Sequence, residues 1–581
     1  MKRTSSGNGW NSFFEGLALG LVLLSLLIVL GRGFGPYWDT WFYHDHAMRW
    51  SGWFSSWTGT VDAPSLLSDP RHYFPDEKRH PPLLEWGGGL FNALFSNPLG
   101  NLSSARLFVE LFAVIWSVAS YLFLKPRIGR GPALVGVALF WGSPRFLLHA
   151  VLFAIDGLIA SIYGITLLSF LFWDKGRKGK ALVYGMLTLA LLTKLQALFL
   201  IPILLVWRLG IVWSEGREGG SKNRVRLFSE TMNVAGVVIA SGLTAFCLWP
   251  ALWLGFPKGL LDYGSFITHH SNIPVLYFGK VYKGPATPPW HYPLVFTLIA
   301  LPLSLTVPFL VRLTRSLLPG TGPWRNRITK DEMLLWLGTA VPLLVSSIPQ
   351  APKYDGIRLL LPAYGPLSLL AALEIGDWWK RTEKRFLSSC SLLLRGVLLL
   401  ALAVFLLMPT LRIYPYNIVY YSPLIGGVTG AREKGFDLDY LGIAAHRLNP
   451  TLRRYARKGD ILLLAGCNAL VGQPNREGWA PVPAGVVPID FKLLRRIKFD
   501  HRNVFAIISS RYDDLGPDAR RVLRNLPALD RVEYRGERLF SLHRITKDFV
   551  RSLPKESPEP APNDTGSSPR SSEKREPSTS P

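Results

Sequence analysis

Long apolar runs separated by short basic clusters constrain this chain more than any other feature of its sequence. A helix needs roughly 20 apolar residues to cross the hydrocarbon layer of a bilayer. Seven runs meet or approach that length, at residues 13–30, 105–124, 232–254, 294–311, 333–348, 357–373 and 392–408. In lipid an α-helix satisfies its backbone polar groups within one segment. The runs therefore predict an all-α polytopic membrane domain.

Two further apolar regions decide the number of crossings. Region 131–173 is about twice the length of one span and is interrupted near Gly142 and Pro144. Region 181–207 is too long for one ideal span and carries Lys194 in its middle. We interpret both as hairpins, which gives about eleven crossings. Lys194 then falls at the outer tip of a hairpin that is too short to bury it deeply.

The distribution of basic residues supports this count and predicts an orientation. With both hairpins, every Lys/Arg cluster between spans falls on the side of Lys2 and Arg3, which the positive-inside rule assigns to the cytoplasm. We expect a multi-pass protein of the cytoplasmic (inner) membrane, with a cytoplasmic amino terminus and an extracytoplasmic segment after Met408. The formal charge of +25 comes from these clusters, so we expect the lipid bilayer and no nucleic acid as a partner.

The carboxyl-terminal part of the chain differs from the rest. We divide the chain into a membrane domain at 1–411, an extracytoplasmic α/β domain at 412–548 and a disordered tail at 549–581. Strand-like runs DILLLAG, NVFAIISS, DRVEYRG and RLFSLHRI alternate with a helical pattern at 518–525. The tail is rich in Pro, Ser and Glu and has almost no apolar residues.

The first outer loop, 31–104, contains the densest set of acidic, histidine and tryptophan side chains between two membrane-length runs. We expect interfacial helices in this loop. Asp39 follows the first span. Asp45 lies between His44 and His46, but adjacent side chains on a helix diverge, so these three residues do not converge on one metal ion. A solvated helix face is the expected setting for them.

Six motifs in sequence order add a resemblance. They are Asp39 within YWDTWFYHDHA, HPPLLEW at 80–86, PRFLLHAVLFAIDGLIAS at 144–161, GMLTLALLTKLQALFLIP at 185–202, DGIRLLLPAYGP at 355–366 and YPYNIVYYSPLIGGVTGAREKGFDLDYLG at 414–442. Over about 1–442 the chain resembles the GT-C superfamily of glycosyltransferases. Within it, the chain looks like bacterial members related to the aminoarabinose lipid A transferase and the protein O-mannosyltransferases.

The resemblance implies a function. It predicts transfer of a sugar from a polyprenyl-phosphate donor to a lipid, glycan or protein acceptor on the outer face of the membrane, with inversion by direct displacement. It also places the general base at Asp39. The family often has two adjacent acids after the first span, whereas Thr40 follows Asp39 here. Asp45 therefore stays open as the catalytic carboxylate, and a divalent metal ion stays possible as a cofactor.

Other residues are candidates for the same site. Spacings of four, seven and eleven predict that Arg145, His149 and Asp156 share one helical face, with Asp156 catalytic and the other two contacting substrate. A structural ion-pair network is the alternative for this stripe.

Three cations are candidates for the donor phosphate: His80, Lys194 and Arg358. The alternatives are a surface location for His80 and snorkelling to the interface for Lys194 and Arg358. His269 is a further candidate for substrate contact.

A transporter or flippase of a lipid-linked sugar is the rival function. Such proteins commonly have pseudo-symmetric halves with charged or broken helices near the midplane. Here the charges cluster at the outer ends of the apolar runs, and the two halves do not match.

Overall fold

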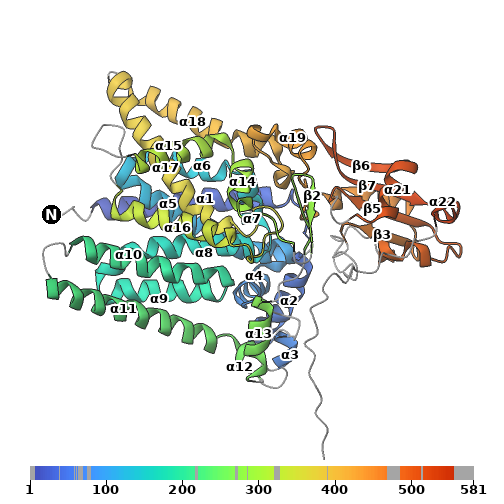
Figure 1. The fold of residues 1–581 in the computed structure, drawn as a ribbon, viewed down its shortest axis with the longest axis horizontal. Coiled ribbons are helices and arrows are strands. Elements are labelled where there is room, and N and C mark those ends of the chain that lie inside the picture. The colour runs from blue at the N-terminus through green and yellow to red at the C-terminus, as the bar shows by residue number, and fades with distance from the viewer. Residues whose placement is uncertain are drawn as a thin grey trace, which may run out of the picture.

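The computed structural model describes residues 7–554 except 38, 58, 60–61, 63, 65–69, 75–79, 216–219, 255, 269–272, 284–285, 319–327, 389, 468–484 and 512–514. A helical bundle occupies one end of the molecule and a small α/β domain the other (Figure 1). The all-α membrane domain with a carboxyl-terminal α/β domain is thereby confirmed as the fold class.

The helices of eight or more residues are α1 (Gly7–Gly31), α2 (Thr40–Ser56), α4 (Leu83–Leu99), α5 (Asn101–Ile128), α6 (Arg130–Trp141), α7 (Pro144–Val151), α8 (Ile155–Ser169), α9 (Arg177–Leu191), α10 (Leu200–Glu215), α11 (Gly220–Cys247), α13 (Lys258–Thr268), α14 (Tyr292–Ala300), α15 (Leu303–Leu317), α16 (Lys330–Ser347), α17 (Leu361–Thr382), α18 (Leu392–Ile413) and α21 (Pro517–Asn525). The shorter helical segments are α3 (Pro70–Tyr73), η1 (Phe170–Lys175), η2 (Leu195–Phe199), α12 (Pro250–Trp253), η3 (Glu383–Leu387), η4 (Asn417–Val419), η5 (Pro423–Ile425), α19 (Gly427–Glu433), η6 (Ile443–Leu448), α20 (Asn449–Tyr455), η8 (Phe491–Arg496) and α22 (Lys547–Ser552).

The bundle has the apolar surface that a bilayer requires. Among the described residues, six helices are long and apolar enough to cross a membrane, or up to seven if the bent pair α6 and α7 forms one span. Helix length and composition thus do not confirm the count of eleven crossings. On α18, Leu392 and Leu393 are 82% and 78% exposed, and such a face is favourable only against lipid or a partner. The chain is a multi-pass membrane protein.

The helix entering the predicted fourth span is interrupted twice. α6 and α7 meet at an angle of 79°. A second break follows, because Leu152 and Ala154 have extended backbone conformations between α7 and α8. Arg145 and His149 are therefore on α7, whereas Asp156 is on α8, and the predicted single helical face is wrong.

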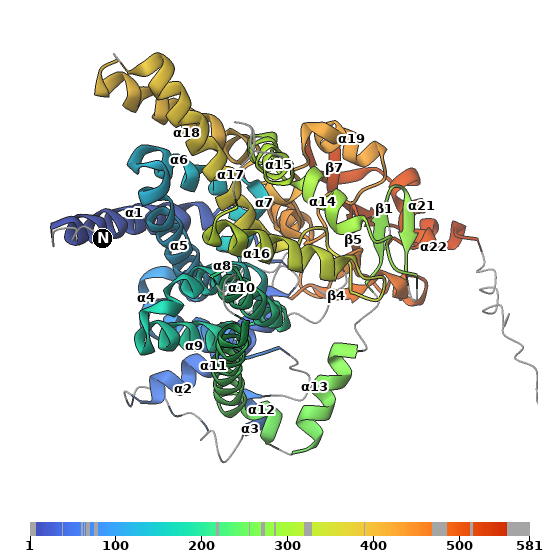
Figure 2. The ribbon, with the colours of Figure 1, turned by 60° about the vertical axis from the view of Figure 1, so that its left-hand side comes forward.

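The first outer loop folds as expected into helices that lie across one end of the bundle, where α2 packs against α4 (Figure 2). The start of α4 is fixed to the bundle by a backbone hydrogen bond, in which the Leu83 amide donates to the Leu192 carbonyl oxygen at 3.0 Å. This contact brings the segment that follows His80 close to the turn that carries Lys194. The second outer loop contributes α13 and a hairpin of β1 (Val275–Tyr277) and β2 (Lys280–Tyr282).

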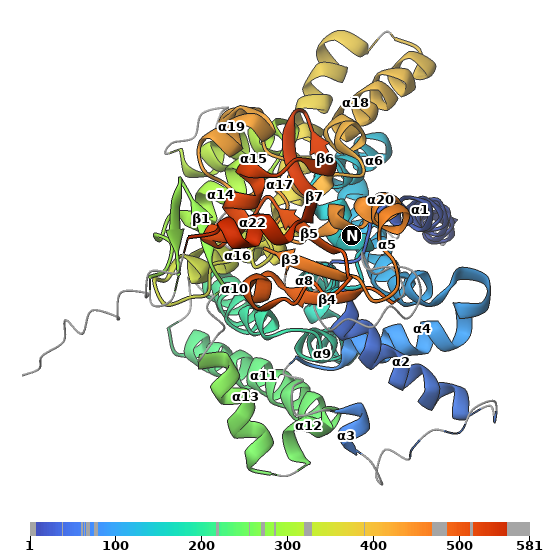
Figure 3. The ribbon, with the colours of Figure 1, turned by 90° about the vertical axis from the view of Figure 1, so that its right-hand side faces the viewer.

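The α/β domain is built on a five-stranded sheet, which faces the viewer in Figure 3. Its strands are β3 (Ile461–Ala465), β4 (Val487–Asp490), β5 (Val504–Ser509), β6 (Ala528–Tyr534) and β7 (Glu537–Ile545), in the order β4-β3-β5-β7-β6. Strand β3 runs parallel to β4 and β5, and β7 runs antiparallel to β5 and β6. The four predicted strand runs are present, and β4 is additional. Helix α22 extends past residue 548 to Ser552, and the tail from 555 lies outside the described residues.

The predicted orientation is testable with single cysteines placed in a background from which Cys247, Cys390 and Cys467 have been removed. Arg224 on α11 and Arg524 on α21 are both exposed, so a cysteine at either position is reachable. A membrane-impermeant thiol reagent should label Arg524→Cys in intact cells and Arg224→Cys only after the cells are permeabilised. Labelling of both from the same side would contradict the arrangement of crossings.

Candidate active site

Arg358 is the centre of a charged cluster to which three separate parts of the chain contribute carboxylates. Its Nε donates to Asp156 Oδ2 at 2.6 Å and its Nη2 to Asp39 Oδ2 at 2.5 Å. Its Nη1 donates to Asp355 Oδ2 at 3.3 Å. Arg358 is buried, and a buried guanidinium is tolerated where carboxylates pair with it. This rules out the snorkelling alternative for Arg358.

Lys194 belongs to the same cluster. Its Nζ donates to Asp156 Oδ1 at 2.6 Å, so both oxygens of Asp156 are engaged by cations. The Lys194 side chain is only 10% exposed, which corrects the expectation that the hairpin is too short to bury it. The reason is that the turn carrying Lys194 packs against the segment that carries Arg358: Gln196 Nε2 donates to the Leu359 carbonyl oxygen at 2.6 Å.

Local backbone geometry explains how Asp156 reaches the cluster. Asp156 is in the first turn of α8, where the positive end of the helix dipole favours a carboxylate. The start of α8 crosses close to α7, because a Cβ at Gly157 would lie 1.8 Å from the His149 carbonyl oxygen. Only glycine permits this approach, which brings His149 and Asp156 together across the helix break.

A tight turn places Arg358. Asp355 and Gly356 have positive φ values of 51° and 62°, and the Arg358 amide donates to the Asp355 carbonyl oxygen at 3.2 Å. A Cβ at Gly356 would lie 2.8 Å from the ring of Tyr440. The Asp-Gly pair therefore forms the turn, and the absence of a side chain at Gly356 lets Tyr440 pack onto it.

Asp39 is the carboxylate of the cluster that remains accessible. Its side chain is 37% exposed, compared with 1% for Asp156 and 3% for Asp355. Oδ2 of Asp39 is held by Arg358, and Oδ1 has no hydrogen-bond partner among the described residues. Asp39 is the N-cap residue of α2, but its side chain makes no capping hydrogen bond, so the helix does not engage Oδ1.

The α/β domain completes the cluster through Arg511, which follows β5. Its Nη2 lies 3.3 Å from Asp355 Oδ1. Its guanidinium also donates to the carbonyl oxygens of Tyr440, at 3.4 Å, and Pro274, at 3.1 Å. Burial raises the pKa of Asp355, and the charges of Arg511 and Arg358 oppose this rise. The cluster thus contains three carboxylates, Arg358, Lys194 and Arg511, and its formal charges balance.

His149 and Arg145 occupy different surroundings. His149 is fully buried beside Asp156, Arg358 and Lys194, and neither of its ring nitrogens has a hydrogen-bond partner in the described part of the chain. Arg145 instead donates from Nε to the Tyr420 carbonyl oxygen at 3.0 Å and stacks on the ring of Tyr421 at 4.4 Å. Arg145 therefore joins α7 to the segment that connects α18 with the α/β domain.

The remaining predicted residues lie at the edge of the cluster or outside it. The ring of His80 lies 6.3 Å from that of Tyr43, which is on α2, the helix that begins directly after Asp39. Burial and the charge of Asp39 raise the pKa of Tyr43 well above its usual range, so its phenol stays protonated. Asp45 pairs with Arg49 at 2.8 Å and its side chain is 45% exposed. His269 lies outside the described residues.

The expectation of a solvated face at 44–46 is wrong for the two histidines. His44 and His46 are buried, and only Asp45 points outward. Burial lowers the pKa of His44 to about 4, so its imidazole is neutral at physiological pH. Within the described ranges, no group of three or more His, Cys, Asp or Glu side chains could hold a metal ion. In the cluster, Arg358 and Lys194 engage both oxygens of Asp156 and one oxygen each of Asp39 and Asp355.

Asp355 and Arg511 were not singled out from the sequence. The signal for Asp355 was present, because the quoted DGIR segment places an acid three positions before Arg358. Arg511 had no comparable signal. It follows a strand of the α/β domain, and only the packing of that domain against the turn at Asp355 brings the two charges together.

Comparison with known proteins gives one family match and several similar structures. Residues 79–249 match the family described as dolichyl-phosphate-mannose-protein mannosyltransferase. No curated protein sequence matches the chain significantly.

Similar structures include ArnT from Cupriavidus metallidurans in the apo state, with 16% identity, coverage of 94% of this chain and 99% of that chain, and a TM-score of 0.46. ArnT bound to undecaprenyl phosphate gives 15% identity, the same coverages and a TM-score of 0.45. The archaeal oligosaccharyltransferase AglB from Archaeoglobus fulgidus, in complex with an inhibitory peptide and a dolichol-phosphate, gives 12% identity, coverage of 78% and 62%, and a TM-score of 0.41.

The family match has a direct bearing on the site. The matched segment includes His80, Arg145, His149, Asp156 and Lys194. It confirms the resemblance to GT-C glycosyltransferases that the sequence motifs indicate.

Proposed function

We propose that this chain transfers a sugar from a polyprenyl-phosphate donor to a hydroxyl group of a lipid, glycan or protein acceptor, on the outer face of the cytoplasmic membrane. The observation that carries the proposal is the position of Asp39. It is a partly exposed carboxylate held by Arg358, next to a buried lysine, in a bundle with lipid-facing helices. The match of residues 79–249 to a family of lipid-linked sugar transferases supports it.

Asp39 serves as the general base in this proposal. Its free Oδ1 accepts the proton of the acceptor hydroxyl while the hydroxyl oxygen forms a bond to the anomeric carbon of the donor sugar. The bond between that carbon and the phosphate oxygen breaks at the same time, and its electron pair leaves with the polyprenyl phosphate. Attack from the face opposite the phosphate inverts the anomeric configuration.

Lys194 and His80 bind the departing phosphate. An ammonium group has three donors, and the described contacts of Lys194 use one of them, toward Asp156. The hydrogen bond between Leu83 and Leu192 keeps the His80 segment beside the Lys194 turn. A charge-assisted bond to a phosphate is about twice as strong as a neutral one and stabilises the charge that develops on the leaving group.

Arg358 takes a different role from the phosphate binding expected from sequence. Each of its three guanidinium nitrogens already contacts a carboxylate. We therefore assign Arg358 to positioning Asp39. His149 is buried beside the cluster with unpartnered ring nitrogens and is suited to contact the substrate. Arg145 is enclosed by tyrosines and has a structural role.

Asp39→Asn tests the base directly. The substitution keeps the size of the side chain but removes the basic oxygen, so transfer should fall by roughly two to four orders of magnitude. The rate of release of polyprenyl phosphate from a synthetic donor measures this, with donor binding and thermal stability measured in parallel. Asp45→Asn is the matched control, because Asp45 is on α2, which begins directly after Asp39, and pairs with Arg49 outside the cluster. Loss of transfer in Asp45→Asn but not in Asp39→Asn would overturn the assignment.

Removal of the two side chains that bind the donor phosphate should impair use of the donor. Lys194→Ala and His80→Ala each remove a donor to the phosphate, and a hydrogen bond to a charged group contributes roughly 1.5–3 kcal/mol. Donor affinity or kcat/KM should therefore decrease about ten- to hundredfold, whereas Lys258→Ala, an exposed cation on α13, should change neither. If both site variants kept the affinity and rate of the native protein, the phosphate site would lie elsewhere.

The contact between Arg511 and Asp355 predicts a coupled effect of the α/β domain on catalysis. Arg511→Gln leaves the buried Asp355 to compete with Asp39 for Arg358, and kcat should decrease about tenfold. Asp355→Asn in the same chain removes that competing charge and should restore much of the loss. A double-mutant cycle of kcat and KM measures the coupling. Strictly additive effects of the two substitutions would show that Arg511 does not act through Asp355.

A further inference from the structure

A groove of about 280 Å³ lies apart from the Arg358 cluster, at the junction of the bundle and the α/β domain. One wall is the end of α18, the other is the start of α15, and the β6–β7 turn closes the end toward the α/β domain. We call it the junction groove.

The two helical walls of the junction groove are apolar. Phe405, Met408 and Pro409 of α18 line it together with Leu303 of α15. Phe405 is 64% exposed and continues the apolar surface of α18, which is long and apolar enough to cross a membrane. The α18 residues that line the groove before Arg412 are thus all apolar, as a hydrocarbon chain that enters from the bilayer requires.

The end of the groove toward the α/β domain carries positive charge that no carboxylate neutralises. Arg412 at the end of α18 and Arg535 in the β6–β7 turn both line it, and no Asp or Glu does. Among the described residues, neither arginine has a hydrogen-bond or ion-pair partner. Both arginines are exposed. Arg312, which is buried in the bundle, instead contacts Glu332, Glu374 and Asp377.

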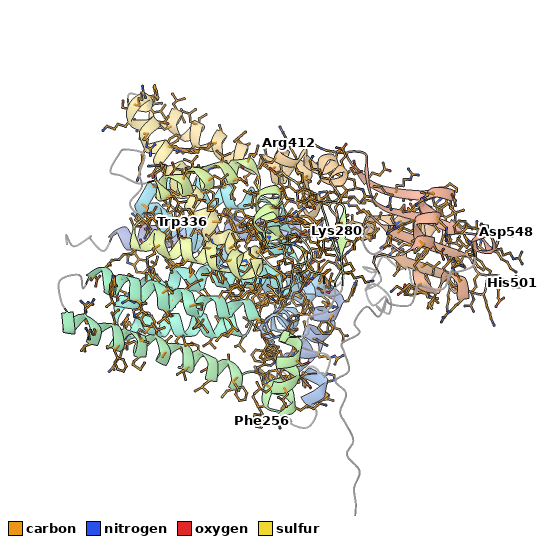
Figure 4. All side chains as sticks on the ribbon, in the orientation of Figure 1. Phe256, Lys280, Trp336, Arg412, His501 and Asp548 are labelled. Atoms are coloured by element: carbon orange, nitrogen blue, oxygen red, sulfur yellow. The ribbon has the colours of Figure 1, made fainter. Side chains whose placement is uncertain are left out.

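Two neutral groups point to an anion at the same place. The hydroxyl oxygen of Ser304 is shielded from solvent and has no hydrogen-bond partner in the described part of the chain. Ser304 is in the first turn of α15, whose free backbone N–H groups and dipole favour a negative charge. Figure 4 places Arg412 at the boundary between the bundle and the α/β domain, far from His501 and Asp548 at the outer end of that domain.

The junction groove is separate from the proposed reaction site. Tyr420 and Tyr421 line it, and the same two residues hold Arg145 through a carbonyl oxygen and a ring face. Arg145 is fully buried, so this layer of side chains stands between the groove and the helix that carries His149. A molecule in the groove does not touch Asp39 or Arg358.

We propose that the junction groove binds an anionic membrane phospholipid. Its phosphate lies between the guanidinium groups of Arg412 and Arg535, and one acyl chain lies between α18 and α15. Because Arg412 belongs to the membrane domain and Arg535 to the α/β domain, the lipid joins the two domains. Charge complementarity and continuity with the lipid-facing surface of α18 both favour this occupant over a soluble anion or a protein partner.

The test uses the full chain in neutral detergent and a phosphatidylglycerol that carries a photoreactive diazirine in one acyl chain. Crosslinks should map by mass spectrometry to the peptides that contain Phe405–Ile413 and the start of α15. Each arginine near an anionic lipid should strengthen binding about fivefold, so Arg412→Gln/Arg535→Gln should weaken it about thirtyfold. Phosphatidylcholine with the same diazirine should crosslink there weakly in every variant.

The matched control is Arg496→Gln/Arg524→Gln, which removes the same charge from exposed positions of the α/β domain outside the groove and should leave binding unchanged. Ser304→Trp fills the groove without a change in charge and should also abolish the crosslink, which covers the case in which the arginine variant folds poorly. Equal crosslinking by both lipids, or crosslinking that survives both groove variants, would show non-specific annular lipid and overturn the proposal. Competition by inorganic phosphate alone, without a requirement for the acyl chain, would also overturn it.

Discussion

The pairing of Arg358 with three carboxylates is the interaction on which the rest of the site depends. A buried guanidinium without a counter-charge is strongly unfavourable, and so is each buried carboxylate. Asp39, Asp156 and Asp355 come from the first outer loop, the start of α8 and the turn before α17, so satisfying Arg358 requires all three segments to meet. Lys194 and Arg511 then balance the remaining negative charge. Each charged side chain in the cluster is thus held in place by a side chain of opposite charge.

This balance gives the three carboxylates different surroundings. Asp156 uses both oxygens for cations and is shielded from solvent, so it organises the cluster. Asp355 connects Arg358 to the α/β domain. Asp39 is held by one oxygen only and faces outward, which is the arrangement that a general base requires: a fixed position and a free lone pair. The ion pairs that bury charge at the helix ends therefore leave Asp39 partly exposed, with one carboxylate oxygen that no cation of the cluster engages.

The sequence predicted the members of the cluster better than it predicted their contacts. Asp39, Lys194 and Arg358 could each be selected as isolated charges near the ends of apolar runs, and Asp156 as part of a polar stripe with Arg145 and His149. Asp39 and Arg358 are 319 positions apart, and neither periodicity nor charge pattern specifies a contact at that separation. Helical spacing failed at residues 152–154, because Leu-Phe-Ala contains no residue that signals a break. The break is evident only from the structure, in which Gly157 packs against the His149 carbonyl oxygen. Strand β4 was missed because it is short and contains Pro488.

The contribution of the α/β domain was also hidden from the sequence. Arg511 and Arg535 are ordinary basic residues in a basic chain, and their significance comes from what lies opposite them. Arg511 reaches a buried carboxylate of the membrane domain, whereas Arg535 shares a groove with Arg412 and meets no acid. The first contact ties the α/β domain to the Arg358 cluster. The second leaves a positive site at the lipid-facing junction.

The central claim is that the Arg358 cluster is where the donor phosphate and the acceptor hydroxyl meet. A cryo-electron microscopy structure of the full chain with polyprenyl phosphate bound tests it most directly. The account predicts phosphate density about 3 Å from Lys194 Nζ and beside His80, with Asp39 still held by Arg358 and its Oδ1 facing the space left for the sugar. Phosphate density remote from Lys194, with the cluster closed to it, would contradict the account.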